Sequence, residues 1–254
     1  MTKPIAATND FVVKFANVNG SGSASANGLF AKVILRMGVP VGARNIFPSN
    51  IQRLPTWYEV RVSEAGWLGR RGGVDLMVAM NPQTWDGDVK SIEPGGYLLY
   101  DNSKPLPASR FRDDITLIGA PLTELIAAEF EDPRQRQLFK NIAYVGVMAQ
   151  LLGIEPDLVK RLLGDEFKGK DKLIAPNFKA FELGRAYAEK NIPPIGLKLR
   201  KSDKVGDRIF AEGNDAAALG AVYGGATFCA WYPITPSTSL AESFQKYCSA
   251  LRKD

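Results

Sequence analysis

Two short stretches of this sequence hold residue types that could bind a ligand. The first is NGSGSASANG at positions 19–28, with the candidate contacts Gly20, Ser21, Gly22 and Ser23. A glycine-rich turn that opens a helix binds phosphate or carboxylate, because free backbone N–H groups and the positive end of the helix dipole meet there. The GxGxxG pattern is incomplete, since its third glycine is replaced by Ser25. We predict anion or cofactor contact, with a tightly packed turn as the alternative.

The second stretch is YPITPST at positions 232–238. Pro233 and Pro236 fix φ and restrict the residues before them, so the hydroxyl of Thr235 has a narrow range of directions. The hydroxyls that follow, on Ser237 and Thr238, can cap a helix or bind a carboxylate. Contact with a substrate or cofactor is predicted here, with a structural turn as the alternative.

The composition restricts what chemistry the chain can do. It has no histidine, which removes Ser-His and Cys-His nucleophile pairs and the commonest transition-metal ligand. Its two cysteines are not spaced as CxxC, so no cysteine-ligated metal site is expected. Carboxylates, hydroxyls, backbone amides or a bound cofactor must act instead.

Charge and hydropathy set expectations about partners. The net charge is +5 and the basic residues are scattered rather than striped, so no nucleic acid is expected as a partner. No apolar run reaches the length of a membrane span, and the N-terminus lacks a signal core. The sequence therefore predicts a cytoplasmic protein without a membrane partner.

The elements that must position these stretches alternate between strands and helices. Strands are predicted at 11–18, 41–47, 57–63, 74–80, 97–101 and 115–119, and helices at 29–37, 122–131, 135–152, 156–163 and 175–190. Such interleaving indicates an α/β domain of three layers with a mostly parallel sheet. Arg53 precedes the strand at 57–63 and Arg61 lies within it, where they could meet an anionic ligand or a partner subunit, with a half-buried strand that carries solvated charges as the alternative.

The organisation changes after position 192. Residues 193–207 combine a proline pair with several basic residues and are predicted to be a solvated linker. In 208–254 a small-residue helix, a short buried strand ATFCAW and an amphipathic helix are expected, with YPITPST joining the strand to the last helix. A unit this short cannot bury a core of its own, so we expect the beginning of a second, incomplete domain.

Several motifs together resemble one enzyme family. GNDAAALGAVYGG followed by YPITPS resembles the start of the α chain of the 2-oxoacid:ferredoxin oxidoreductases. FANVNGSGSASANG, PSNIQRLPTWYEVRVS, VDLMVAMN and NIAYVGVMAQLLGI are similar to the γ domain of the same enzymes. The resemblance follows the family's order along the chain and is best to the 2-oxoglutarate type with γ fused ahead of α. It implies a Rossmann-like γ domain at 1–192, a linker, and at 208–254 a pyrimidine-binding α domain for thiamin diphosphate that is truncated early.

The resemblance also implies an activity. Such enzymes oxidatively decarboxylate a 2-oxoacid, here 2-oxoglutarate to succinyl-CoA, with thiamin diphosphate as cofactor, coenzyme A as co-substrate and ferredoxin as electron acceptor. By this correspondence Thr235 contacts the substrate, while Tyr232, Pro233 and Ile234 lie near the thiamin. The glycine-rich turn of Gly20 to Ser23 would contact coenzyme A.

Other components are expected outside this chain. Mg²⁺ and a [4Fe-4S] cluster would belong to a β subunit, in an (αβ)2 assembly, and this chain alone would be inactive and hold no metal. The turn departs from the family's denser glycine pattern at Asn17, Asn19 and Ser21, which leaves its ligand open. The alternative is a non-catalytic module that binds coenzyme A or docks a partner subunit.

Overall fold

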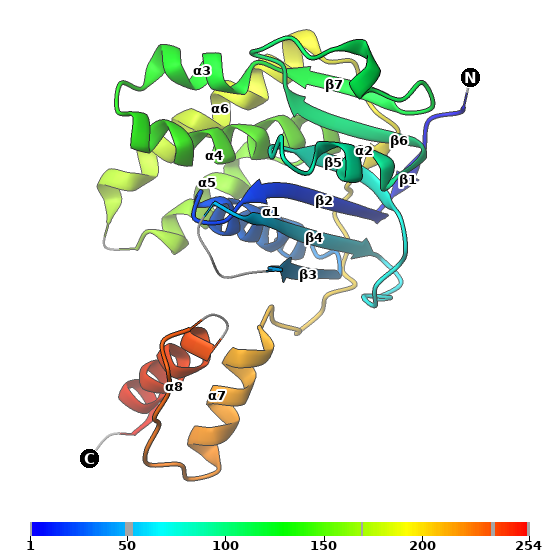
Figure 1. Ribbon diagram of the computed structural model, residues 1–254. Helices are drawn as coiled ribbons and strands as arrows, with labels where there is room; N and C mark the ends of the chain where they lie inside the picture. The colour runs from blue at the N-terminus through cyan, green and yellow to red at the C-terminus, as the bar shows by residue number, and fades with distance from the viewer. Residues whose placement is uncertain (1, 49–52, 169, 235–236, 253–254) are drawn as a thin grey trace. The chain divides into compact units, whose positions relative to one another are not determined.

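The computed structural model describes residues 2–48, 53–168, 170–234 and 237–252. The chain forms two compact units, Met1–Gly206 and Asp207–Asp254. Figure 1 shows the elements of both units.

The first unit is built on a six-stranded sheet with the order β3-β4-β2-β5-β6-β7. Its strands are β2 (Asp10–Val18), β3 (Val41–Ile46), β4 (Pro55–Ser63), β5 (Val74–Ala79), β6 (Ile92–Asp101) and β7 (Thr116–Ala120). Strands β2, β5, β6 and β7 pair in parallel, whereas β4 is antiparallel to both β2 and β3. The predicted α/β fold with a mostly parallel sheet is confirmed.

Helices cover both faces of this sheet. They are α1 (Ser23–Arg36), α2 (Trp85–Lys90), α3 (Leu122–Glu129), α4 (Pro133–Leu152), α5 (Pro156–Glu166) and α6 (Ile174–Asn191). On one face Phe15 packs its ring against Phe30 of α1 and Tyr144 of α4. On the other, Ala16 and Met77 lie in a cluster with Trp85 of α2. Figure 1 shows α1 and α2 on opposite sides of the strands, which gives three layers.

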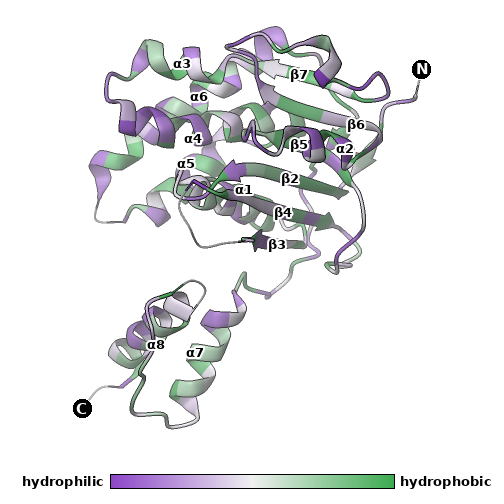
Figure 2. Cartoon of the chain, viewed as in Figure 1, coloured by the Kyte–Doolittle hydropathy of each residue, from purple (hydrophilic) through white to green (hydrophobic). Residues whose placement is uncertain are grey.

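The burial of each strand follows from its residue pattern. All six residues of β5 are buried, as expected for a central parallel strand covered on both faces. In β4, Val60 and Val62 are fully buried, while Glu59 and Arg61 point to the opposite face. Figure 2 shows the apolar residues concentrated in the central strands.

Helices α4 and α6 cross at two glycines. A Cβ added to Gly146 would lie 2.0 Å from the backbone oxygen of Phe181, and one added to Gly184 would lie 1.9 Å from that of Ala143. No side chain fits at such distances, so the two backbones approach closely because both residues are glycine. This crossing packs the long helix α4 directly against α6.

The two ends of the first unit lie side by side. Strand β1 (Ala7–Thr8) pairs in parallel with β8 (Leu197–Lys198). The hydroxyl of Tyr97 joins them, since it donates to the backbone oxygen of Ile5 at 2.7 Å and accepts from the backbone N–H of Gly196 at 2.9 Å. The first and last strands of the unit are thus joined by hydrogen bonds.

A solvated linker was expected over 193–207, but part of this segment packs on the first unit. Leu197 and Leu199 are buried, and the backbone N–H of Val205 donates to the oxygen of Gly38 at 3.1 Å. The segment packs on the first unit because its apolar residues alternate with period two, a pattern that the basic residues between them conceal.

The second unit is a pair of helices, α7 (Gly213–Tyr223) and α8 (Ser237–Leu251). Ala218, Val222 and Phe244 form its small buried cluster. Both helices were predicted, but the strand ATFCAW was wrong: residues 226–231 have no regular structure, and Phe228 is 81 % exposed. A strand needs a neighbouring strand to satisfy its backbone, and the described part of this unit supplies none.

No helix of the described chain combines the length and the apolar character needed to cross a bilayer.

Candidate functional site

The glycine-rich turn lies at the carboxyl end of β2, beside the carboxyl end of the parallel strand β5. From β2 the chain runs through α1 to β3 and β4 on one side, whereas β5 to β7 extend on the other. Open α/β sheets bind ligands outside the carboxyl ends of their strands at such a reversal of strand order. The turn therefore occupies the position in this fold where a ligand is expected.

The backbone of the turn has the form predicted for anion binding. Gly20 and Gly22 take left-handed φ angles of 81° and 76°, which favour glycine. Gly22 is the N-cap of α1, and among the described residues no side chain caps the helix by a hydrogen bond. The first N–H groups of a 14-residue helix are thus free of a side-chain cap.

A hollow of about 240 Å³ opens at this turn. Three of the four predicted contacts, Gly20, Gly22 and Ser23, line it. Ser21 is not among the lining residues; it is 7 % exposed, and its buried hydroxyl has no hydrogen-bond partner in the described part of the chain. Ser21 is thus buried within the turn, whereas its neighbours Gly20 and Gly22 lie at the hollow.

A buried polar network holds the turn from beneath. Asn27 Nδ2 donates to Asn17 Oδ1 at 3.2 Å, and the hydroxyl of Tyr144 donates to Asn27 Oδ1 at 2.8 Å. Asn141 Nδ2 donates to the backbone oxygen of Ser21 at 2.8 Å. Burial raises the pKa of Tyr144 above its ordinary value, so its hydroxyl stays protonated and acts as a donor.

Sequence reasoning missed this network. Asn17 was noted only as a departure from a glycine pattern, whereas its side chain joins the end of β2 to α1. The signal was the presence of asparagine and tyrosine among apolar neighbours, because a buried amide needs hydrogen-bond partners.

The two arginines of the proline-bounded segment have different positions. The backbone N–H of Arg53 donates to the oxygen of Asn19 at 2.9 Å, so this exposed residue lies beside the glycine-rich turn. Arg61 instead forms an ion pair with Asp10 at 2.5 Å and donates to the backbone oxygen of Val62. Only Arg53 is brought to the predicted anion site.

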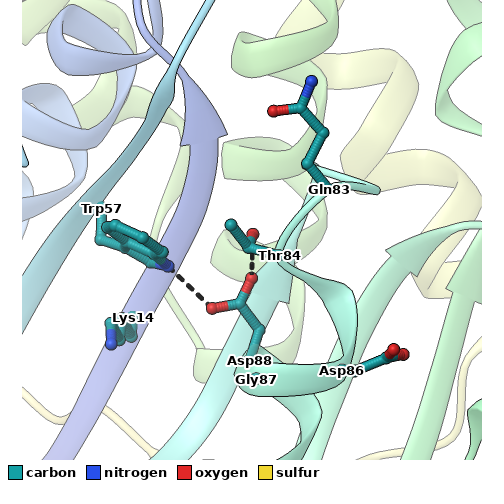
Figure 3. Close-up of a pocket in the computed structure, with 7 residues that line it drawn as sticks. All are labelled: Lys14, Trp57, Gln83, Thr84, Asp86, Gly87 and Asp88. Carbon is teal, nitrogen blue, oxygen red and sulfur yellow. Dashed lines mark hydrogen bonds between the residues drawn. The ribbon is translucent and has the colours of Figure 1, made fainter. Parts of the chain in front are cut away.

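A second hollow, of about 380 Å³, lies on the other face of the sheet (Figure 3). Its buried carboxylate is Asp88, whose oxygens accept hydrogen bonds from Trp57 Nε1 at 2.7 Å and Thr84 Oγ1 at 2.5 Å. The ammonium of Lys14 lies 5.5 Å from the centre of the Trp57 ring. Burial raises the pKa of Asp88, against the effect of the hydrogen bonds from Thr84 and Trp57. The sequence did not predict this cluster.

The residues expected near thiamin lie on a loop of the second unit. Tyr232 is 77 % exposed and Ile234 is 46 % exposed. The hydroxyl of Ser237 donates to the backbone oxygens of Tyr232 and Ile234 at 2.9 and 2.6 Å, which closes the loop at the start of α8. Thr235 lies outside the described residues.

Comparison with known proteins identifies the family. The sequence profile described as "Pyruvate ferredoxin/flavodoxin oxidoreductase" matches residues 12–187. The chain belongs to this family.

Members of this pyruvate ferredoxin/flavodoxin oxidoreductase family are similar over nearly the whole chain. Subunit alpha of 2-oxoacid:ferredoxin oxidoreductase 2 from Aeropyrum pernix is 23 % identical over 90 % of this chain and 41 % of its own length. 2-Oxoglutarate oxidoreductase subunit KorA from Mycobacterium tuberculosis is 21 % identical over 93 % of this chain and 41 % of its own. This chain thus spans about two fifths of the relatives that it matches.

Solved structures agree with this assignment. The 2-oxoglutarate:ferredoxin oxidoreductase of Magnetococcus marinus, with 2-oxoglutarate, coenzyme A and succinyl-CoA bound, is 26 % identical with a TM-score of 0.81. The match covers 97 % of this chain and 42 % of that one. Pyruvate oxidoreductase subunit PORC of Thermotoga maritima shares the fold, with 18 % identity and a TM-score of 0.56 over 70 % of this chain and 96 % of its own.

Proposed function

We propose that this chain is part of a 2-oxoacid:ferredoxin oxidoreductase that converts 2-oxoglutarate and coenzyme A to succinyl-CoA and carbon dioxide, with ferredoxin as electron acceptor. The observation that carries this proposal is the match to the M. marinus enzyme, which covers 97 % of this chain. That enzyme was solved with 2-oxoglutarate, coenzyme A and succinyl-CoA bound. The KorA relative, named for 2-oxoglutarate, supports the same substrate.

The first unit would bind coenzyme A at the hollow beside the glycine-rich turn. Coenzyme A carries phosphate groups, and the first N–H groups of α1 suit an anion because no side chain caps them. Gly20, Gly22 and Ser23 line that hollow, and Arg53 lies next to the turn. We assign these four residues to coenzyme A and give Ser21, which faces inward, a structural role.

The second unit would supply Thr235 as the substrate contact and Tyr232, Pro233 and Ile234 near the thiamin ring. Because they are exposed, Tyr232 and Ile234 do not enclose a cofactor within this chain. Among the described residues no three His, Cys, Asp or Glu side chains are grouped to hold a metal. Mg²⁺ and the [4Fe-4S] cluster are assigned to a β subunit, in an (αβ)2 assembly.

Reduction of methyl viologen tests the activity. The chain is combined with its β partner, thiamin diphosphate, coenzyme A and either 2-oxoglutarate or pyruvate. We expect reduction that depends on coenzyme A and is faster with 2-oxoglutarate. A lack of coenzyme-A-dependent reduction with every 2-oxoacid would refute the proposed activity.

Isothermal titration tests the coenzyme A site. Gly22→Ala is expected to weaken coenzyme A binding at least tenfold, because φ at this position is 76° and the new Cβ would lie 2.3 Å from Leu138 Cδ2. Gly164→Ala is the matched control, since a Cβ at Gly164 has no neighbour within 4 Å. Equal affinity in the two variants would remove the turn from the site.

A further inference from the structure

Asp88 is a buried carboxylate that the glycine-rich turn does not contact. Its residue is 3 % exposed, and both of its oxygens accept hydrogen bonds, one from Trp57 Nε1 and one from Thr84 Oγ1 (Figure 3). A carboxylate buried in this way is costly unless donors hold it, whereas an apolar residue would pack there without that cost.

The indole of Trp57 is held on two sides. Its N–H edge donates to Asp88 at 2.7 Å, and Lys14 Nζ lies over its ring at 5.5 Å from the centroid. A hydrogen bond to a charged acceptor fixes the direction of the ring, and the cation–π contact fixes its face. Trp57 is thus anchored to helix α2 through one side chain of that helix.

Trp57 is also the residue that the two hollows share, since it belongs to the lining of both. Its neighbours on β4, Thr56 and Tyr58, line the glycine-turn hollow but not the hollow beside Asp88. Neighbouring strand residues point to opposite faces of a sheet. The backbone of β4 is held here by its pairing with β2 and β3, so a displacement of the Trp57 side chain acts on the glycine-turn hollow through Trp57 itself, which lines it.

We propose that Asp88 is a positioning residue for ligand binding at the glycine-turn hollow: it holds in place Trp57, which itself forms part of the wall of that hollow. This inference rests on the proposed binding of coenzyme A there. Asp88 acts from the opposite face of the sheet and touches no ligand itself.

The test compares coenzyme A affinity in four variants of the full chain, alone and with its β partner. Asp88→Leu removes both acceptor oxygens, and Trp57→Phe removes the donor; each is expected to weaken binding about tenfold. Asp88→Asn keeps one acceptor oxygen and is expected to stay within about twofold of wild type. The double variant Asp88→Leu with Trp57→Phe should bind no worse than either single variant, because both remove the same contact.

Asp86→Asn is the matched control. Asp86 lines the same hollow, but its side chain is 86 % exposed, and its ion pair with Arg110 spans 3.7 Å. No change in coenzyme A affinity is expected. Additive losses in the double variant, or an equal loss in the control, would overturn a role that acts through Trp57.

The indole N–H signal of Trp57 in ¹⁵N NMR gives a second readout, assigned by its absence in Trp57→Phe. In Asp88→Leu it should shift and exchange faster with water, while Asp88→Asn should restore it in part. If Asp88→Leu does not fold, Trp57→Phe and Asp88→Asn carry the comparison. An altered indole signal with unchanged coenzyme A affinity would overturn the inference alone, whereas a wild-type chain that binds no coenzyme A would defeat the proposed function of the hollow and this inference with it.

Discussion

Replacing Gly146 by alanine tests the crossing of α4 and α6. The new Cβ would lie 2.0 Å from the backbone oxygen of Phe181, whereas ordinary contacts begin near 3.4 Å, so the helices must separate by more than an ångström. Overpacking of this kind costs about 1 to 3 kcal/mol, and the higher helix propensity of alanine returns about 1 kcal/mol at most. Because the obstacle is backbone and cannot rotate away, we expect a net loss of about 2 kcal/mol in the free energy of unfolding.

Urea denaturation followed by circular dichroism measures this loss, and a thermal scan should show a Tm lower by about 4 to 8 °C. Gly164→Ala in α5 is the control, because its Cβ would have no neighbour within 4 Å. This control should be stabilised by up to about 1 kcal/mol. If Gly146→Ala were as stable as Gly164→Ala, the close approach of the two backbones would be refuted.

Three further predictions concern stability and activity. Burial raises the pKa of Asp101, but hydrogen bonds from Ser103 and Thr123 and the charge of Lys140 lower it more, so the folded pKa lies below 3.8. The stability that this carboxylate contributes is therefore present above about pH 4 and is lost as the pH falls through its folded pKa. In Asp101→Asn the urea midpoint should consequently fall less between pH 6 and pH 3 than it does in the wild-type chain. Tyr144→Phe leaves the buried Oδ1 of Asn27 without its donor and should cost about 1 to 3 kcal/mol in the free energy of unfolding, whereas an unchanged urea midpoint would speak against the network. Thr235→Val should raise KM for 2-oxoglutarate in the viologen assay with the β subunit, and an unchanged kcat/KM would remove Thr235 from the site.

The sheet could be predicted from sequence because its pattern is local. The run VDLMVA in β5 is apolar except for Asp75, and β4 alternates between Val60 and Val62 on one face and Glu59 and Arg61 on the other. The glycine-rich turn could also be predicted, because glycine is the residue type that takes φ above zero most readily, as Gly20 and Gly22 do.

Features that depend on distant parts of the chain could not be read in this way. Asp88 and Trp57 are 31 positions apart, and Asn27 and Tyr144 are 117 apart, so no spacing in the sequence joins them. ATFCAW has the apolar composition of a strand, yet a strand forms only beside a partner, and composition does not show whether one is present. The pairing of β1 with β8 could not be predicted for the same reason, because the two strands are far apart in the sequence.

That pairing has a consequence for how this unit combines with others. The first strand of the unit lies against its last, and one hydroxyl, that of Tyr97, joins the two chain segments. The first and last strands of the unit therefore lie together, beside the start of β2, whereas the glycine-rich turn follows the end of β2. Covalent attachment of a further domain there leaves the sheet, its helices and the ligand position unaltered. The same fold can then serve as a separate subunit, as in the T. maritima protein, or as one segment of a longer polypeptide, without any change to its core.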